Sequence, residues 1–342
     1  MPGIISAQEI AVARRGGPDV LAVRTVERAV PEGDQVLIRV ATAGVAYGDL
    51  LLREGLVPGA GSSPVPGYDV VGVVEEAGPT ARFSPGDRVA AWTGGTGGYT
   101  TRALVSDRYV VIVPDSVTDE TASALVLTYI TAWQMLTRAS SVGEGGTILV
   151  HGATGAVGQA VVELARLRGL RVIGTGSSRR LAALSGDDFV GVDRAGDWSA
   201  EVRRAASDGV DAAFDGVGGR VGRRSLSLLR TGGTLVVYGA TGALRNGRRS
   251  IVGLAGAALG SAWATSMGLF VRGIGIQGYV STRFVADHPA WFASDLTLLL
   301  ELAAEERIAP RIAATLPMER AAEAHRMLAR GVEGKVILRS DS

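Results

Sequence analysis

The sequence contains no cysteine. This absence excludes disulfides, thiolate zinc sites, iron–sulfur clusters and a cysteine nucleophile. Histidine is scarce as well and occurs only at His151, His288 and His325. His151 ends a predicted strand, and we expect the other two to be surface or packing residues of helices. We therefore expect no metal and, in particular, no catalytic zinc site.

An excess of either charge is also lacking. Lys and Arg total 35, Asp and Glu total 34, and the formal net charge is +1. A chain this balanced has no field that would attract nucleic acid or an acidic surface, so we expect no nucleic-acid partner. The hydrophobic fraction of 46% excludes global disorder. The length of 342 residues suggests roughly two domains.

We also expect neither a signal peptide nor a clear membrane span. Residues 1–17 have no apolar segment behind a basic start. The longest apolar stretch covers residues 250–271 and carries no charge, but it is rich in glycine, alanine and small polar residues. We interpret it as buried helix and loop, and we expect a cytoplasmic protein without an integral membrane span. A membrane or interface role for this stretch is the alternative.

The first third of the sequence is strand-like. Short β-rich runs at residues 36–40, 70–75, 88–91 and 109–113 are separated by turn signals of glycine, proline and aspartate. Their close spacing predicts a small barrel or sandwich. A helix with acidic residues at its start is predicted next, over residues 119–138.

Strands and helices alternate in the rest of the chain. The predicted strands cover residues 147–150, 170–173, 188–192, 210–214, 235–238 and 273–276. Short buried strands that alternate with helices predict an α/β fold with a doubly wound parallel sheet. The tail predicts helices over residues 290–306 and 318–329 and a final strand over residues 335–339.

The most informative segment is a glycine-rich loop between a strand and a helix. Gly152, Gly155 and Gly158 follow the strand at residues 147–150, and a helix begins at once. Glycines there allow a tight turn and a close approach of the backbone to a pyrophosphate, which the helix N-terminus then stabilises. The context of strand, loop, helix and second strand predicts a dinucleotide site; an ordinary glycine-rich turn is the alternative.

The end of the second strand indicates which dinucleotide is bound. Residues 174–180 (GTGSSRR) contain no Asp or Glu, the residue type that recognises the ribose hydroxyls of NAD. Hydroxyl and guanidinium groups suited to a 2′-phosphate are present at Ser177, Ser178, Arg179 and Arg180, and Arg194 is a further candidate. This pattern favours NADPH. Solvated arginines at a helix start are the alternative explanation.

Several further motifs carry a family resemblance. They are residues 43–49 (AGVAYGD), 66–74 (PGYDVVGVV), 83–89 (FSPGDRV), 151–158 (HGATGAVG), 215–219 (DGVGG) and 324–335. Over nearly its whole length the sequence resembles medium-chain dehydrogenases/reductases of the zinc-free quinone oxidoreductase (zeta-crystallin-like) branch. The resemblance implies a GroES-like β-barrel catalytic domain and a Rossmann NADPH-binding domain. It also implies an active site in the cleft between them and, commonly, a homodimer formed through Rossmann edge strands.

The resemblance also suggests domain boundaries. The GroES-like domain would comprise residues 1–120 and 282–342, and the Rossmann domain residues 121–281. In the zinc-dependent branch a cysteine and a histidine ligand would stand where this chain has Ala46 and Tyr68. Ala46 also replaces the asparagine usual in quinone reductases, and residues 54–58 lack the tyrosine acid of related enoyl-thioester reductases.

The resemblance assigns roles residue by residue. We expect Tyr47 to act as hydrogen-bond donor or acid, with aromatic packing as its alternative, and Tyr68 and Tyr279 to line the substrate pocket. Thr131 and Thr128 lie on the helix that faces the nicotinamide in this family. The expected cofactor-binding residues are Thr128, Gly152, Ala153, Thr154, Gly155, Ala156, Val157, Gly158, Gly176, Ser177, Ser178, Arg179, Arg194, Gly216, Val217, Gly239 and Ala240.

Three functions fit the sequence. The first is an NADPH-dependent, zinc-independent reductase of a quinone or an α,β-unsaturated carbonyl compound, because a conjugated acceptor needs no Lewis acid to receive hydride. The second is an enoyl reductase that acts on a carrier-bound or biosynthetic intermediate. The third is a non-catalytic NADPH-binding or membrane-associated protein that retains the fold.

Overall fold

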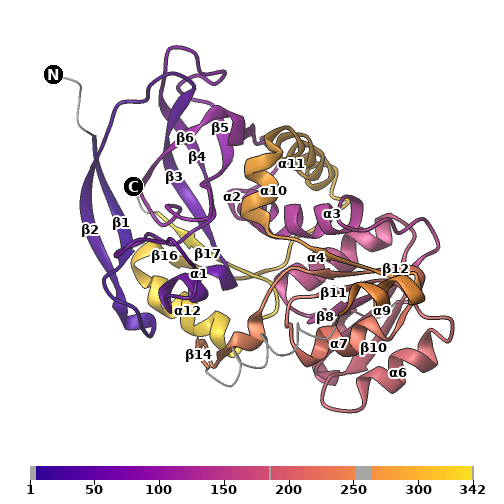
Figure 1. The fold of residues 1–342 in the computed structure, drawn as a ribbon. Helices are drawn as coiled ribbons and strands as arrows, with labels where there is room; N and C mark the ends of the chain where they lie inside the picture. Colours follow the sequence, from indigo (N-terminus) through magenta and orange to yellow (C-terminus); the bar gives the residue numbers. More distant parts are fainter. Residues whose placement is uncertain (1–4, 185, 251–263, 341–342) are drawn as a thin grey trace. The chain divides into compact units, whose positions relative to one another are not determined.

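The computed structural model describes residues 5–184, 186–250 and 264–340. The chain divides into two compact units (Figure 1). Unit 1 comprises residues 1–130, 246–248 and 281–342, and unit 2 comprises residues 131–245 and 249–280.

Unit 1 is built on a seven-stranded sheet. Its strands run in the order β16 (Ile312–Pro317), β17 (Lys335–Arg339), β3 (Gln35–Val45), β4 (Asp69–Ala77), β5 (Arg88–Trp92) and β7 (Val110–Ile112), with β6 (Arg102–Ser106) paired to β3. The antiparallel pairing of β17 with β3 brings the two ends of the chain into one sheet (Figure 1). Its core contains apolar side chains from both chain segments, such as Ile38, Val70 and Leu338.

Several other elements complete unit 1. They are the antiparallel hairpin of β1 (Ile5–Val12) and β2 (Leu21–Arg28), and the helices α1 (Tyr47–Arg53), α2 (Asp119–Ala124), α10 (Ser281–Asp287), α11 (Pro289–Ala304) and α12 (Ala321–Arg330). Helix α1 carries Tyr47 directly after β3, and α12 packs against β17 and α1. These two contacts position the candidate site residues of this unit.

Unit 2 is a six-stranded parallel sheet in the order β10-β9-β8-β11-β12-β15. The strands are β8 (Thr147–His151), β9 (Arg171–Gly176), β10 (Phe189–Asp193), β11 (Val210–Asp215), β12 (Leu229–Val237) and β15 (Gly275–Gly278). In chain order this is 3-2-1-4-5-6, the Rossmann arrangement. Its core packs apolar residues of neighbouring strands, including Leu149, Ile173 and Ala213, against helix residues such as Trp198.

Helices connect the strands of unit 2. They are α3 (Ile130–Thr137), α4 (Ala156–Leu167), α5 (Ser178–Leu181), α6 (Trp198–Ala205), α7 (Arg220–Leu226) and α9 (Ser266–Arg272). Helix α4 packs on β8 and β9, α6 on β9 and β10, and α7 on β11 and β12. Two short strands, β13 (Leu244–Arg245) and β14 (Arg248–Arg249), form a separate hairpin.

The structure refines several sequence expectations. The helix expected over residues 119–138 is α2, a π-helical turn at Leu125–Tyr129, and α3. The division between the units falls at residue 130, ten residues later than expected, because α2 packs on β3, β4 and the C-terminal strands. The hairpin β1–β2 and strand β16 were not anticipated.

The apolar stretch at residues 250–271 is described only in part. Residues 251–263 lie outside the described residues, so the interpretation of buried helix and loop is not addressed there. The remainder includes most of α9, whose Met267, Phe270 and Val271 side chains are exposed rather than buried. Across the residues that the structure covers, no helix combines the length and hydropathy needed to cross a bilayer.

Candidate functional site

The glycine loop of unit 2 has the geometry of a phosphate cradle. Gly152, directly after β8, has φ +69, and a Cβ built there would meet no atom within 4 Å. Gly155 is the N-cap of α4 and supplies no side-chain hydrogen bond to the helix start. The first backbone N–H groups of α4 therefore have no side-chain cap, and they carry the positive end of the helix dipole.

Gly158 serves a different purpose from Gly152. A Cβ at Gly158 would lie 2.2 Å from the carbonyl oxygen of Gly152 and 2.7 Å from Cα of Ala153. Only glycine at this position lets the first turn of α4 approach the loop this closely. The loop is also tied to β9, because the N–H of Ala153 donates to the carbonyl of Thr175 over 3.0 Å.

Two more predicted segments meet beside this loop. The Asp215 carboxylate at the end of β11 accepts from the N–H groups of Val217 (2.8 Å) and Gly218 (3.0 Å) and so fixes the turn that follows. The N–H of Thr241, after β12, donates to the carbonyl of Gly216 over 2.9 Å. A Cβ at Gly239 would lie 2.9 Å from that same carbonyl, so the two turns are in close contact.

The ends of β9 and β10 hold the residues expected to recognise a 2′-phosphate. Ser178 and Arg179 are exposed at the start of α5, and Arg194 is exposed just after β10. The structure adds a residue that the sequence analysis missed. Asp193, the last residue of β10, accepts hydrogen bonds from the hydroxyl and the N–H of Ser178. The register of the sheet, which pairs Asp193 with Gly176, was the missing information.

The residues of unit 2 fit an adenine dinucleotide. Except for Thr128, the predicted cofactor-binding residues lie at or just beyond the carboxyl ends of β8, β9, β10, β11 and β12. Ligands of open α/β sheets bind at that edge. An uncapped twelve-residue helix and a glycine whose Cβ position is open provide donors and space for phosphate groups.

Unit 1 brings Tyr47 and Tyr68 near one another. Tyr47 opens α1, and partial burial raises the pKa of its phenol to about 12. A Cβ built on Gly48 would lie 2.1 Å from the Tyr68 hydroxyl, so this hydroxyl lies against α1. Burial and the nearby Asp49 also raise the pKa of Tyr68. Both phenols therefore remain protonated at neutral pH and can act as donors.

Asp49 anchors the segments that carry the two tyrosines. Its carboxylate accepts from the N–H of Ala46 (2.7 Å), the N–H of Gly67 (2.8 Å) and the Tyr99 hydroxyl (3.0 Å). Complete burial raises the pKa of Asp49 to about 6, against the opposing effect of these donors. Asp49 caps α1 from the third helical position, because the helix begins at Tyr47.

A chain of buried hydrogen bonds leads away from Asp49. Arg53 Nη1 lies 3.1 Å from Nδ1 of His325, and Nε2 of His325 lies 3.2 Å from the Tyr99 hydroxyl. A guanidinium only donates, so Nδ1 accepts and Nε2 carries the proton of a neutral ring. Burial, followed by the charge of Arg53, lowers the pKa of His325 to about 3. The ring therefore stays neutral at physiological pH.

A second buried polar pair lies between β4 and β17. Lys335 is the single lysine of the sequence, and its Nζ lies 3.7 Å from Oδ2 of Asp69. The other carboxylate oxygen of Asp69 accepts from the N–H of Gly44 (2.7 Å) and the hydroxyl of Ser123 (3.0 Å). Among the described residues, neither Lys335 Nζ nor Asp69 Oδ2 has a hydrogen-bond partner.

The remaining predicted site residues lie in buried positions. Thr128 belongs to the π-helical turn in unit 1, and Thr131 belongs to α3 in unit 2, three residues further along. Tyr279 is almost fully buried in unit 2, where its hydroxyl donates to Oε1 of Gln134 over 2.9 Å. The catalytic role of Thr131, the nicotinamide contact of Thr128 and the pocket role of Tyr279 stay predictions.

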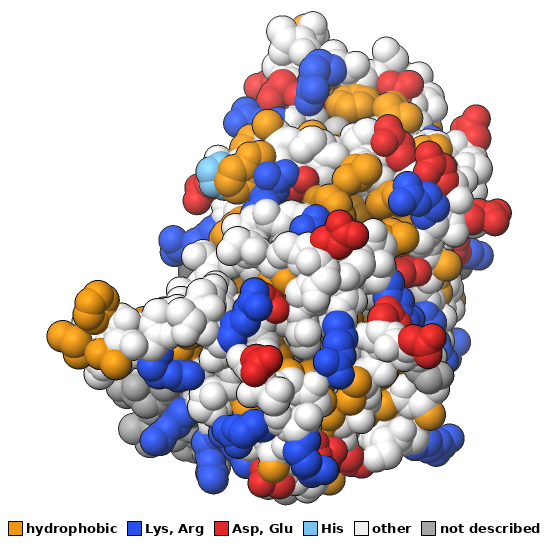
Figure 2. Space-filling view, turned by 90° about the vertical axis from the view of Figure 1, so that its right-hand side faces the viewer, with side chains coloured by type: hydrophobic (Ala, Val, Ile, Leu, Met, Phe, Trp, Pro, Cys, Tyr) orange, Lys and Arg blue, Asp and Glu red, His pale blue; other side chains and the backbone are white. Residues whose placement is uncertain are grey.

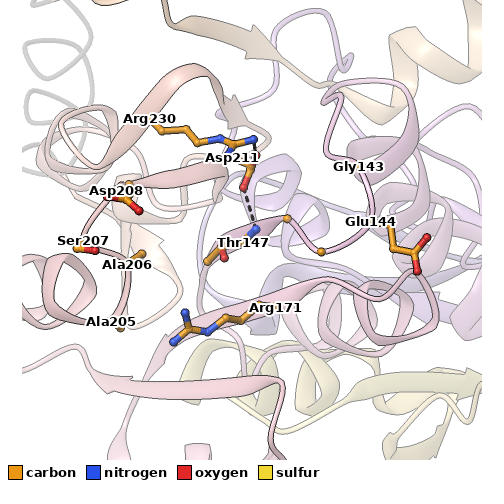
Figure 3. A pocket seen from close by; sticks show the side chains of 13 residues that line it. Gly143, Glu144, Thr147, Arg171, Ala205, Ala206, Ser207, Asp208, Asp211 and Arg230 are labelled. Atoms are coloured by element: carbon orange, nitrogen blue, oxygen red, sulfur yellow. Dashed lines mark hydrogen bonds and ion pairs between the residues drawn. The ribbon is translucent and has the colours of Figure 1, made fainter.

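A polar pocket of about 370 Å³ lies at the opposite edge of the unit 2 sheet. Its lining includes Thr147, Arg171 and Arg230, from the amino ends of β8, β9 and β12. Figure 3 shows the Arg230 side chain reaching Asp211, which accepts from the N–H of Thr147 over 2.8 Å. The pocket is therefore separate from the glycine loop and contains none of the predicted site residues.

The described residues include no group of three or more His, Cys, Asp or Glu side chains arranged to hold a metal ion. His151 is buried, with its ring nitrogens 3.0 Å from the Thr175 hydroxyl and 2.7 Å from the Ser225 hydroxyl. His325 is held by Arg53 and Tyr99.

Acidic and basic side chains share the face of the molecule drawn in Figure 2, with hydrophobic side chains between them.

Comparison with known proteins identifies two domains. Residues 32–115 match the alcohol dehydrogenase GroES-like domain, and residues 185–338 match the family described as zinc-binding dehydrogenase. The chain is 33% identical over 240 residues to part of a phenolphthiocerol/phthiocerol polyketide synthase of Mycobacterium tuberculosis. That match covers 68% of this chain but spans only about a tenth (11%) of the synthase polypeptide.

Other relatives match over almost their whole length. The chain is 31% identical to the quinone oxidoreductase of Mus musculus over 341 residues, which is 96% of each protein. A mycobacterial structure solved in complex with NADPH is 29% identical, with a TM-score of 0.83 and coverage of 97% of this chain and 99% of that one. The fold and these similarities establish that the chain belongs to the zinc-independent, quinone oxidoreductase-like branch of the medium-chain dehydrogenase/reductase superfamily.

Proposed function

We propose that this protein is an NADPH-dependent oxidoreductase that reduces a quinone or an α,β-unsaturated carbonyl compound without a metal. The observation that carries the proposal is the convergence of glycine turns from β8, β11 and β12 at one edge of a Rossmann sheet. The similarity to a quinone oxidoreductase and to a structure holding NADPH supports it. When bound, a reduced nicotinamide supplies hydride.

The chain's own residues would bind the nucleotide and supply a proton. The N–H groups of the loop Gly152–Gly158 would hold the pyrophosphate, and Arg179 and Arg194 would attract the 2′-phosphate. Tyr47 stays protonated, since its pKa is raised to about 12. Its phenol would donate a hydrogen bond to the oxygen on which charge develops and then transfer its proton, which completes a two-electron reduction.

The proposal is tested by nucleotide binding followed by turnover. Titration with NADPH, followed by the change in its fluorescence, should saturate, and oxidation of NADPH should then proceed with a quinone or a 2-enal. Tyr47→Phe should lower kcat about 100-fold or more, because the proton donor is lost, and should leave the NADPH affinity unchanged. Tyr109→Phe is the matched control, since Tyr109 is a partly buried tyrosine of the same unit, in the short helical turn Asp107–Tyr109, and is not among the predicted site residues. An unchanged kcat in Tyr47→Phe would assign Tyr47 to packing.

A second candidate is an enoyl reductase that acts on a carrier-bound or biosynthetic intermediate. The 33% identity to part of a polyketide synthase favours it. Turnover with enoyl thioesters, and with no quinone or free enal, would select this candidate. Binding of NADPH without turnover of any acceptor would instead indicate a non-catalytic nucleotide-binding protein.

We further propose that two copies associate through β15, at the edge of the unit 2 sheet. In the described part of the chain only β12 pairs with β15. Helix α9, just before it, exposes Met267, Phe270 and Val271, and a patch of exposed apolar side chains is typical of an interface. Sedimentation should give a dimer for the native chain and a shift toward monomer for Phe270→Glu. A monomeric native chain at micromolar concentration would contradict this.

A further inference from the structure

A carboxylate occupies the place where the sequence suggested a 2′-phosphate would bind. Asp193 ends β10 directly beside Gly176 of β9. Its Oδ2 atom accepts from the hydroxyl of Ser178 and, over 3.3 Å, from the Ser178 N–H. Its Oδ1 atom accepts from the N–H of Ala195 over 2.8 Å. Both donors of Ser178 that could recognise a phosphate are therefore engaged within the protein.

The charge of Asp193 is maintained at neutral pH. The hydrogen bond from the Ser178 hydroxyl, together with the N–H of Ala195 and the charge of Arg194, lowers the pKa of the carboxyl group. An ionised carboxylate repels a 2′-phosphate dianion, whereas it can accept a hydrogen bond from a free ribose hydroxyl. The exposed Arg179 and Arg194 have the opposite effect, because their positive charges attract a 2′-phosphate.

We propose that Asp193 is a specificity-determining residue that weakens recognition of the 2′-phosphate and reduces the preference for NADPH over NADH to a small one. The inference rests on the proposed function, because it requires a nicotinamide dinucleotide at the carboxyl edge of the unit 2 sheet. It goes beyond that function by naming the group that opposes the arginines. A 2′-phosphate can engage Ser178 only after the carboxylate has released it.

The experiment compares NADPH and NADH binding in three proteins, by fluorescence titration without any acceptor. For the native chain we expect the two dissociation constants to agree within about ten-fold. For Asp193→Asn we expect the preference for NADPH to rise by roughly five-fold or more, since one repulsive charge is removed from an exposed site. Asparagine retains an oxygen that can accept from Ala195.

Asp188→Asn is the matched control. Asp188 directly precedes β10, at the opposite end of the strand from Asp193, and pairs with Arg166 over 2.8 Å. The control removes the same charge from the protein while leaving Ser178 untouched, so it should not change the ratio of the two affinities. If Asp193→Asn melts well below the native chain, Asp193→Ser serves as a second variant and should show the same rise.

The outcomes separate the inference from the proposed function. Binding of both nucleotides with an unchanged ratio in the Asp193 variants overturns the inference and leaves the proposed function intact. A native preference for NADPH above about a hundred-fold also overturns it, because the carboxylate would then have no effective role. If neither nucleotide binds the native chain, the proposed function itself fails.

Discussion

At the scale of single residues, the buried pair of Lys335 and Asp69 gives the sharpest stability test. Both side chains are nearly inaccessible to water, and a buried charge that loses its partner is strongly unfavourable. We expect Lys335→Met to lower the free energy of unfolding by about 3 kcal/mol, because the Asp69 carboxylate is then left uncompensated. Urea denaturation measures this change.

A double variant shows whether the two charges are coupled. Adding Asp69→Asn to Lys335→Met should recover most of the loss, because no unpaired charge remains. Arg339→Met, on the same strand, is the control. Its partner is Glu120 and its side chain is 56% exposed, so its removal should cost less than about 1 kcal/mol. A double variant no more stable than Lys335→Met would show that the pair is uncoupled.

At the scale of elements, the junction of β8 and α4 makes a testable distinction between two glycines. Gly158→Ala forces a methyl group to within 2.2 Å of the Gly152 carbonyl oxygen. We expect it to lower the free energy of unfolding by about 2 kcal/mol, because helix and loop must separate. Gly155→Ala is the matched comparison: its Cβ would lie 3.4 Å from the same oxygen, and its φ of −80 suits alanine.

Thermal melting distinguishes the two alanine variants. Gly155→Ala should melt close to the native chain, while Gly158→Ala should melt several degrees lower. Equal melting temperatures for both would contradict the close approach of α4 to the loop.

The same elements show how far sequence patterns can predict strand and helix positions. The strand predicted at residues 147–150 ends within one residue of β8, and the helix predicted directly after the glycine loop is α4.

Other elements were beyond the reach of sequence patterns. Strand β2 of the β1–β2 hairpin is exposed along most of its length, so it lacks a clear alternation of apolar residues. Strand β16 is likewise only partly buried and pairs with β17 across more than twenty residues. The π-helical turn at Leu125–Tyr129 interrupts a helix without any proline or glycine signal. Tertiary contacts determine all three features.

At the scale of the whole molecule, each unit contains one buried neutral histidine. Burial lowers the pKa of His151, in unit 2, to about 4, and the pKa of His325, in unit 1, is lowered to about 3. Below about pH 6.5, the pKa of an unfolded histidine, the rings take up protons in the unfolded chain but not in the folded one. The free energy of unfolding therefore falls as the pH drops below about 6.5. Asp49, whose pKa is raised to about 6, takes up a proton in the folded chain first. Its contribution therefore raises the free energy of unfolding as the pH falls from about 6 to 4, by less than the two histidines lower it.

We therefore expect the free energy of unfolding to fall by on the order of 2 kcal/mol between pH 7 and pH 5. Urea denaturation across this range measures the slope. His325→Gln should flatten it, because one of the two titrating rings is removed. His288→Gln should not, because His288 is exposed and stacks on Trp291 at the surface. A slope that is the same in all three proteins would contradict the assignment.

The sequence alone determined the class of fold, the position of the glycine loop between β8 and α4, and the absence of zinc ligands at residues 46 and 68. It could do so because glycine spacing, strand periodicity and residue type are local properties of the chain. Tertiary structure alone decided which groups surround each candidate residue. Asp193 meets Ser178 only through the pairing of β9 with β10. His325 reaches Tyr99, 226 positions away, only because the C-terminal segment of the chain folds together with the N-terminal segment in unit 1.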